Sequence, residues 1–491
     1  MIDNLLVHQS TTLRDTLLKI DRNAHGIAFV VDDAEVLVGI ATDGDIRRAL
    51  LADISLDSEI TSVMTREFIC LPIDARASDI FAALSDKVHI IPLVDESNRP
   101  VDFATFSRHK RIPVSEPSLT GNEAAYVLDC LHTNWISSKG AYIAKFENAF
   151  AAYTGSENAI AVSNGTTALQ LALAALGIGP GDEVIVPNLT FAASASAVIH
   201  TGAKPVLVDV NRSDWNLDAF LAGQAITPRT RAIMPVHLYG MPVDMAAIKA
   251  LAQRHGLFVV EDAAEGIGSF HEGRHVGGLG DAGCFSFFGN KTITTGEGGM
   301  ALFADPEIAA RARILRDHGM DPDRRYWHQE VGFNFRLTNL QAAIGVAQME
   351  KIDTIMARKH EISQLYRDLL QGVEGIELPP LAENGVNSHW AFTIIIDQDA
   401  AGISRDELMN KLNLAGIETR PVFYPLNEMP AFRAYAGENA LPVSAEISRN
   451  GLSLPSSTSL SDDAIKHIVT SLLQNFSTRT LITHFMPDSL E

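Results

Sequence analysis

Cysteine is scarce in this chain, and its three residues are not spaced as pairs. Cys70, Cys130 and Cys284 are scattered through 491 residues, and none belongs to a Cys-x-x-Cys pair. This distribution argues against a disulfide framework and against a thiolate metal site. We therefore expect no metal centre, and a cytoplasmic location is favoured.

Basic residues are also few relative to acidic ones. Lys and Arg number 39 against 60 Asp and Glu, which gives a net charge of −21. Because nucleic acids and anionic membranes bind clustered cations, we expect neither as a partner. No apolar run is long enough to span a bilayer, and the opening MIDNLLVHQSTT lacks the pattern of a signal peptide. The hydrophobic share of 46% is that of a globular protein, and the length predicts two or three domains.

The first 110 residues contain a repeated strand–turn–strand pattern. Apolar strands are predicted at residues 26–31 and 36–41, with a helix starting after residue 42. A weaker copy follows at residues 89–94 and 101–106. The repeat predicts a separate, internally duplicated module at residues 1–110.

The stretch VLVGIATDGDIRRAL in this module resembles a CBS-domain pair. The resemblance implies a possible site for an adenine or guanine nucleotide. Thr42 and Asp45 of its T-x-x-D pattern would contact phosphate and ribose, whereas the second copy lacks this pattern at residues 104–106. The alternative is that the module only docks domains or subunits.

After a basic, proline-containing linker at residues 107–117, apolar strands alternate with helical patterns. Strands are predicted at residues 160–162, 183–186, 205–210, 232–236, 257–260 and 282–287. This alternation predicts an α/β fold with a mostly parallel sheet in a large domain, residues 111–349. An amphipathic helix at residues 350–370 and a strand at 390–396 predict a smaller α+β domain at residues 350–491.

Three polar motifs each follow a predicted strand of this sheet. Gly165 and Thr166 lie in a small polar turn before a helix, where phosphate binds readily. Asp262 ends a buried strand and could pair with a protonated ring nitrogen. Lys291 precedes a glycine-rich turn, and a partly buried lysine amine can attack a carbonyl.

Each motif alone has an ordinary alternative: a common strand–helix turn, an aspartate that caps a helix, or a solvated lysine. Together they favour a different interpretation. Phosphate turn, carboxylate and lysine occur in that order, and these are the three contacts that pyridoxal 5′-phosphate (PLP) requires.

Several long motifs then resemble the DegT/DnrJ/StrS sugar aminotransferase family. They are SNGTTALQLALAALGIGPGDEVIVPNLTF, PVHLYGMPVDM, VVEDAAEGIG, GDAGCFSFFGNKTITTGEGG and GFNFRLTNLQAAIG. The resemblance runs from about residue 112 to the C-terminus and thins after about residue 396. It implies a fold-type I PLP-dependent transferase that forms a homodimer with shared active sites.

The resemblance also implies roles for single residues. Lys291 would bind PLP as an imine and later move a proton, and Asp262 would pair with the pyridine nitrogen. Phe191 would stack on the ring, and its alternative is ordinary core packing. Glu265, near the ring hydroxyl, stands where many members have Gln or His. The phosphate would be held by Gly165, Thr166, Ser286 and, from the partner subunit, Asn334.

Two further stretches, residues 135–142 and 315–328, resemble the GDP-perosamine synthase subgroup. They imply GDP-4-keto-6-deoxymannose as acceptor, glutamate as amino donor, and a role in O-antigen or related glycan synthesis. The implied substrate contacts are Trp135, Ser137, Arg324, Tyr326 and His328. Arginines suit carboxylate or diphosphate groups, although residues 324–325 could equally be a solvated loop.

Lys291 also separates two branches of the family, because the dehydratase branch has histidine at this position. The lysine therefore favours amino transfer over deoxygenation. Alternative acceptors are UDP- or dTDP-linked keto sugars. A different class, a nucleotide-sensing regulator with a PLP-fold scaffold, is disfavoured by the intact Lys291 and Asp262; a module that tunes the enzyme stays open.

Overall fold

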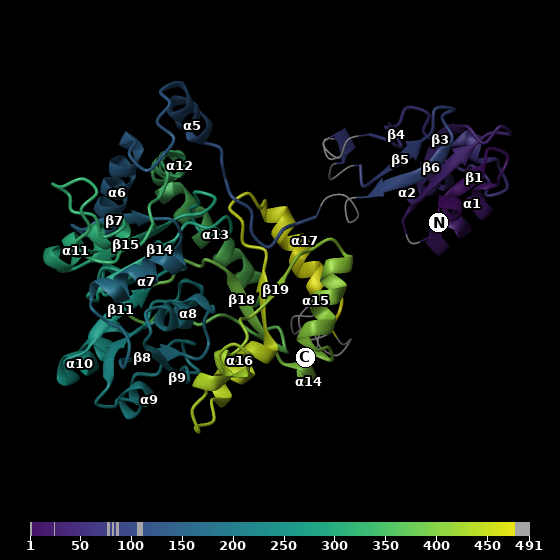
Figure 1. Cartoon of the computed structure of the whole chain (residues 1–491). Coiled ribbons are helices and arrows are strands. Elements are labelled where there is room, and N and C mark those ends of the chain that lie inside the picture. Colours follow the sequence, from purple (N-terminus) through teal and green to yellow (C-terminus); the bar gives the residue numbers. More distant parts are fainter. Residues whose placement is uncertain are drawn as a thin grey trace. The chain divides into compact units, whose positions relative to one another are not determined.

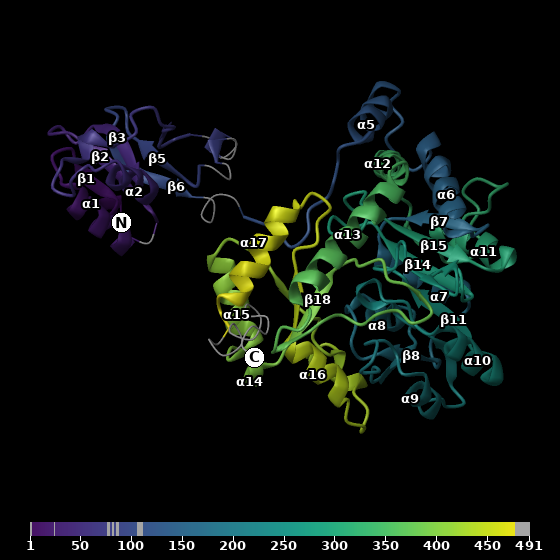
Figure 2. The same ribbon diagram turned by 180° about the vertical axis from the view of Figure 1, so that it is seen from behind.

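The structure, a computed structural model, describes residues 2–23, 25–75, 79–80, 83–84, 88–105 and 111–476. The chain divides into two compact units, Met1–Ile112 with Leu414–Ile417, and Pro113–Asn413 with Glu418–Glu491 (Figure 1, Figure 2). Residues 106–110, which include part of the expected linker and the end of a predicted strand, lie outside the described residues. The division into domains at residues 110 and 349 stays a prediction.

The first unit contains two three-stranded sheets with the same arrangement. In each, a short strand pairs in parallel with a central strand, which pairs antiparallel with the third. The strands are β1 (Leu6–His8), β2 (Ile27–Val31), β3 (Leu37–Thr42), β4 (Leu71–Pro72), β5 (Ile90–Val94) and β6 (Pro100–Thr105). Four helices that the structure describes here are η1 (Ile2–Asn4), α1 (Leu13–Asn23), α2 (Asp43–Leu51) and η2 (Ile60–Ser62). The repeated arrangement confirms the predicted duplication.

A seven-stranded sheet forms the centre of the second unit, in the order β7-β15-β14-β11-β10-β8-β9. Its strands are β7 (Ala159–Val162), β8 (Glu183–Pro187), β9 (Lys204–Val208), β10 (Thr230–Ile233), β11 (Phe258–Asp262), β14 (Ala282–Ser286) and β15 (Gly299–Phe303). All neighbours are parallel except β15, which runs antiparallel to both β14 and β7. The predicted, mostly parallel sheet is confirmed, and β15 is a strand that we did not predict.

Helices cover both faces of this sheet. Successive side chains of a strand point to opposite faces, and in these strands the side chains on both faces are mostly apolar, so both faces need to be covered. In β7, Ile160 and Val162 belong to a buried apolar cluster that also includes residues of α7, α8 and α11, whereas Ala159 and Ala161 belong to one that includes residues of α6, α10 and α12. The helices are α5 (Glu123–His132), α6 (Ala141–Thr154), α7 (Gly165–Ala175), α8 (Ala193–His200), α9 (Ala219–Gln224), η3 (Leu238–Gly240), α10 (Met245–His255), α11 (Pro306–Arg316) and α12 (Asn339–Met349). A small separate sheet is formed by β12 (Phe270–His271), β13 (Arg274–His275) and β17 (Gly385–Val386).

The long helix α13 (Ile352–Leu370) leads into a smaller antiparallel sheet, ordered β16-β18-β20-β19. Its strands are β16 (Ile376–Glu377), β18 (Phe392–Ile396), β19 (Arg420–Pro421) and β20 (Gly451–Leu454). The helices that follow α13 in the chain are α14 (Gln398–Ala401), α15 (Arg405–Leu414), η4 (Leu426–Glu428), η5 (Arg433–Tyr435), α16 (Pro442–Asn450) and α17 (Asp462–Leu473). The predicted helix and strand are confirmed, although Leu365 and Leu369 are only partly buried because Tyr366 and Leu370 take the core positions.

None of the helices that the structure describes combines the length and the apolar character needed to cross a membrane.

The buried carboxylate of Glu261 in β11 ties two loops to the large sheet. It accepts a hydrogen bond from His237 Nε2 at 3.0 Å and three from backbone N–H groups of residues 277–280 at 2.6–2.7 Å. The N–H of Val243 donates to His237 Nδ1, so this imidazole is neutral and donates through Nε2. Burial raises the pKa of Glu261, but the donors outweigh burial and hold the pKa below its ordinary value.

Replacing Glu261 by alanine is expected to lower the free energy of unfolding by about 3–5 kcal/mol, because several buried donors lose their acceptor. The pKa of Glu261 is lower in the folded chain than its ordinary value of 4.5. The stabilisation is therefore present above that pH and is lost as the pH falls through the folded pKa. Urea unfolding at neutral and acidic pH measures this, with the exposed Glu157→Ala as control. Equal losses in the two variants would contradict the expectation.

Candidate active site

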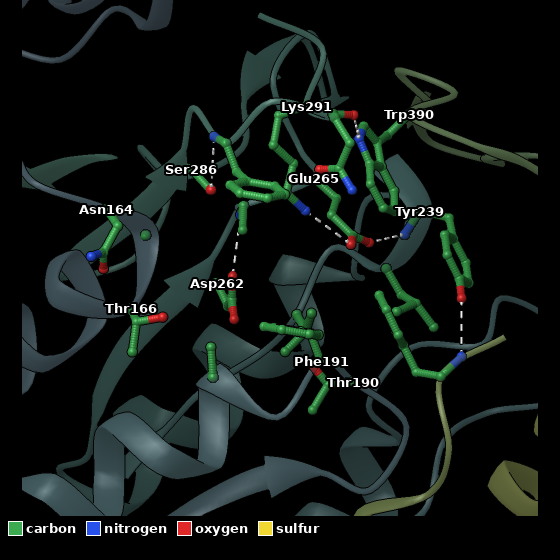
Figure 3. A pocket seen from close by; sticks show the side chains of 18 of the residues that line it. Asn164, Thr166, Thr190, Phe191, Tyr239, Asp262, Glu265, Ser286, Lys291 and Trp390 are labelled. Carbon is green, nitrogen blue, oxygen red and sulfur yellow. Dashed lines mark hydrogen bonds and ion pairs between the residues drawn. The ribbon is translucent and has the colours of Figure 1, made fainter. Parts of the chain in front are cut away.

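A cavity of about 640 Å³ lies at the carboxyl ends of the parallel strands of the large sheet. Its walls come from the loops after β7, β8, β10, β11 and β14, and from segments beside β18 and β19 (Figure 3). Ligands of open α/β sheets bind at this edge, because the loops there bring polar groups from several strands together. Within the described ranges, no group of three or more His, Cys, Asp or Glu side chains could hold a metal ion.

The amino end of α7 forms one wall of the cavity. Asn164 caps the helix by accepting from the N–H of Thr167 at 2.9 Å, and the Thr167 hydroxyl accepts from the N–H of Asn164 at 3.1 Å. The next residues, Gly165 and Thr166, line the cavity. A Cβ on Gly165 would lie 2.8 Å from the Cβ of Ser286, so glycine permits this close approach. First-turn N–H groups and the helix dipole make this end suited to a phosphate.

Asp262 supplies a buried carboxylate to the same cavity. It is the last residue of β11, and only 5% of its surface is exposed. Its oxygens accept from the Ser194 hydroxyl at 2.7 Å and from the N–H of Ala264 at 3.1 Å. A turn, and not a helix, follows Asp262 in the chain, so the alternative that it caps a helix is wrong. Burial raises its pKa, and a cation in the cavity would favour the charged form.

Lys291 lies in the loop between β14 and β15, and its side chain is only 12% exposed. It is therefore not the solvated lysine of the alternative interpretation. Its Nζ is 3.2 Å from Glu265 Oε1 and 4.1 Å from the centre of the Trp390 ring (Figure 3). The other Glu265 oxygen accepts from the N–H of Tyr239 at 2.8 Å. Burial raises the pKa of Glu265, although the nearby lysine opposes this.

These groups fit PLP. An amine for its aldehyde, a buried carboxylate for its ring nitrogen and a helix amino end for its phosphate line one cavity. The predicted cofactor residues that line the cavity are Gly165, Thr166, Phe191, Asp262, Glu265, Ser286 and Lys291. Phe191 is 59% exposed, which leaves its ring available to a ligand.

The remaining predicted residues do not line this cavity. They are all exposed, and they are Asn334, Trp135, Ser137, Arg324, Tyr326 and His328. The Arg324 guanidinium lies 4.0 Å from the centre of the Trp327 ring, and Asn334 Oδ1 accepts from Arg336 Nε at 3.1 Å. Their roles stay predictions, because contacts within one chain do not include those that a partner subunit would make.

Thr42 and Asp45 lie in the first unit and make contacts with each other. The Thr42 hydroxyl donates to Asp45 Oδ2 at 2.7 Å and accepts from the N–H of Asp45 at 3.1 Å, which forms a capping box at the start of α2. Asp45 also pairs with Arg48. The T-x-x-D pattern therefore stabilises a helix, and its nucleotide contact stays a prediction.

Several aromatic residues of the cavity were not predicted. Trp390 stacks in parallel on Tyr239 with ring centres 5.9 Å apart, and Tyr239 stacks on Phe423 at 5.5 Å. Phe423 in turn lies 5.7 Å from Phe191. These residues are far apart in the sequence, and although Tyr239 lies in the motif PVHLYGMPVDM, no motif assigned any of them to the cavity. Tyr239 has a left-handed backbone, with φ of 53°, which the sequence also does not signal.

Comparisons with known proteins agree with this site. The DegT/DnrJ/EryC1/StrS aminotransferase family matches residues 117–473, and the CBS domain matches residues 1–52 and 59–108. The chain is 48% identical to GDP-perosamine synthase of Caulobacter vibrioides, over 74% of this chain and 98% of that protein. It is 45% identical to GDP-perosamine synthase of Escherichia coli, over 75% and 99%.

Solved structures give the same result. DesV of S. venezuelae, in complex with a ketimine intermediate, is 38% identical and superposes with a TM-score of 0.68 over 72% of this chain and 94% of its own. The predicted family, fold type, cofactor and N-terminal CBS domain are confirmed. The chain belongs to the DegT/DnrJ/EryC1/StrS aminotransferase family, as a PLP-dependent sugar aminotransferase that carries an N-terminal CBS domain.

Proposed function

We propose that this enzyme transfers the amino group of glutamate to GDP-4-keto-6-deoxymannose, and so makes the 4-amino sugar. The substrate is supported by the two GDP-perosamine synthases, which match over almost their whole length. The observation that carries the reaction type is the Lys291 amine in one cavity with Asp262 and the amino end of α7. We place the reaction in the cytoplasm, as the cysteine distribution predicts.

PLP, when bound, supplies an aldehyde that condenses with amines and a ring that accepts the electron pair left when a neighbouring carbon loses a proton. Lys291 would hold the cofactor between turnovers. Once displaced, its amine would move a proton between carbon atoms of cofactor and substrate as a positioned general base. Glu265, 3.2 Å from the amine, would keep it directed towards the cavity.

The other walls would hold the cofactor in place. Asp262 would pair with the ring nitrogen and keep it protonated, because a buried carboxylate favours an adjacent cation. Gly165, Thr166 and Ser286 would bind the phosphate. Phe191, with its exposed ring, would pack against the cofactor ring.

We also propose a homodimer with shared active sites. Tyr326 is 73% exposed and Trp135 is 53% exposed, as expected for aromatic residues that a second subunit covers. Asn334 would reach the phosphate from the partner subunit. The nucleotide sugar would contact Trp135, Ser137, Arg324, Tyr326 and His328. Sedimentation that showed only monomers would contradict this arrangement.

The substrate is tested with nitrogen-labelled glutamate and a panel of GDP-, UDP- and dTDP-linked 4-keto sugars. Mass spectrometry of the products should detect the label in the GDP-linked sugar at a lower enzyme concentration than in the UDP- or dTDP-linked sugars. Preferential labelling of a UDP- or dTDP-linked sugar would correct the nucleotide. No label in any product would overturn amino transfer itself.

For the CBS domain we propose a nucleotide site that tunes the enzyme. Thr42 and Asp45 of the T-x-x-D pattern support it, and residues 104–106 of the second repeat lack that pattern. Added ATP, AMP or GDP should change the rate of the full-length enzyme, and Asp45→Asn should weaken the change. A rate unaffected by all three nucleotides would contradict this role.

A further inference from the structure

Lys359 is a buried lysine outside the cavity, on α13. Only 6% of its surface is exposed. Its Nζ donates to two main-chain oxygens, those of Trp390 and Ser456, both at 2.8 Å. Burial lowers its pKa to about 7, and none of the ion pairs found among the described residues involves it. Burying an amine costs free energy unless it is hydrogen-bonded. The two hydrogen bonds of Lys359 therefore stabilise the carbonyls of Trp390 and Ser456 in their observed positions.

Trp390 connects this lysine to the catalytic one. Its carbonyl is held by Lys359, and its indole N–H donates to the Asn290 carbonyl at 2.9 Å. Asn290 directly precedes Lys291 in the sequence. Trp390 is therefore held both at its main-chain carbonyl and at its indole N–H. The centre of its ring lies 4.1 Å from Lys291 Nζ (Figure 3). The chain thus places an aromatic wall from the smaller sheet region beside an amine from the large sheet.

The other contact of the amine is fixed in a similar way. Glu265 is 3.2 Å from Lys291 Nζ, and the N–H of Tyr239 donates to its second oxygen. The left-handed backbone of Tyr239 is a conformation that a non-glycine residue adopts at some energetic cost. The Tyr239 ring is parallel to Trp390, within 6°. Trp390 and Glu265 therefore both contact the Lys291 amine. The two contacts are connected, because the Trp390 ring stacks on Tyr239 and the Tyr239 N–H donates to Glu265.

We propose that Trp390, held in place by Lys359, is a positioning residue that directs the Lys291 amine during proton transfer. The inference rests on the proposed role of Lys291 and deepens it. A base that swings between cofactor and substrate must return to one geometry, and small misplacements of such a group reduce rates strongly. An aromatic face also stabilises a neighbouring cation, so Trp390 favours the protonated form of the nitrogen.

The test uses the PLP-loaded, full-length enzyme and three variants, Trp390→Leu, Trp390→Phe and Lys359→Met. The readouts are kcat, KM for the sugar, and the pH midpoint of the visible absorbance of the bound cofactor. Trp390→Leu should lower kcat about ten-fold, change KM less than about two-fold, and move the midpoint to lower pH. Trp390→Phe keeps an aromatic face, so its pH midpoint should lie closer to the wild-type value than that of Trp390→Leu.

Lys359→Met should give the same kind of change, because it releases the Trp390 carbonyl. Adding it to Trp390→Leu should cause no further loss of kcat, since both act through one contact. The control is Lys351→Met, which removes another lysine that donates to a main-chain carbonyl, that of Ser118, and that also pairs with Glu123. This control should leave the midpoint unchanged.

Several outcomes would overturn the inference. One is a pH midpoint of the cofactor absorbance in Trp390→Leu that equals the wild-type value. This measurement does not depend on Lys359→Met, so it still decides the question if that variant fails to fold. Additive losses in the double variant would show that Lys359 acts elsewhere. If borohydride reduction left no cofactor on Lys291 of the wild-type enzyme, the proposed function and this inference would both fail. Attachment to Lys291 with an unmoved midpoint would reject the inference alone.

Discussion

Replacing Lys291 by alanine is expected to lower kcat for amino transfer by at least about a thousand-fold, because the covalent anchor and the proton-transfer base are lost together. Lys291 is the lysine of the cavity wall, and its amine is directed by Glu265 at 3.2 Å. The measurement is transfer of labelled nitrogen from glutamate to the sugar. Borohydride reduction followed by peptide mass analysis should find a pyridoxyl group on residue 291 of the wild-type enzyme alone.

The control for this prediction is Lys249→Ala, an exposed lysine on α10. It should keep the wild-type rate. If Lys291→Ala transferred nitrogen as fast as this control, the amine would have no part in the reaction. Amino transfer itself would then stand, but the anchoring and proton-transfer roles proposed for Lys291 would be wrong.

The second large effect is expected at Asp262. Asp262→Asn should lower kcat by about a hundred- to a thousand-fold, since a neutral amide cannot balance a protonated ring nitrogen. The amide oxygen can still accept from Ser194 or Ala264, so the loop should keep its shape. Steady-state kinetics measure the loss, and the absorbance of the bound cofactor reports whether PLP still binds.

Asp244→Asn is the matched control, because Asp244 caps α10 at the surface and asparagine caps equally well. It should leave kcat unchanged. A variant Asp262→Asn that bound PLP and turned over at the wild-type rate would show that the ring nitrogen needs no charged partner. The role proposed for this carboxylate would then be wrong.

Much of the site could be predicted because its parts are local. Gly165, Asp262 and Lys291 each lie at or shortly after the end of a strand of one mostly parallel sheet, and the carboxyl ends of such strands meet at one edge. Strong apolar patterns located the strands within a few residues. The exception was β15, which follows a glycine-rich turn and runs antiparallel between β7 and β14. No periodicity in its own residues distinguishes its direction.

The contacts of Lys291 could not be predicted in the same way. Trp390 and Tyr239 are separated by about 150 residues, yet their rings stack. The Trp390 ring contacts the Lys291 amine, and the Tyr239 N–H donates to Glu265, which contacts the same amine. Glu265 stood out only as an unusual residue in a motif, and its pairing with Lys291 emerged from geometry. Likewise, the T-x-x-D pattern of Thr42 and Asp45 proved to be a capping box.

The sequence by itself determined the class of fold, the cofactor and the three groups proposed to anchor it, because each depends on a strand and the few residues after it. Only the tertiary structure decided how the amine is held. Glu265 reaches the amine from the loop after β11, whereas Trp390 reaches it from the segment before β18 of the smaller sheet. Contacts between segments so far apart in the chain leave no local pattern in the sequence.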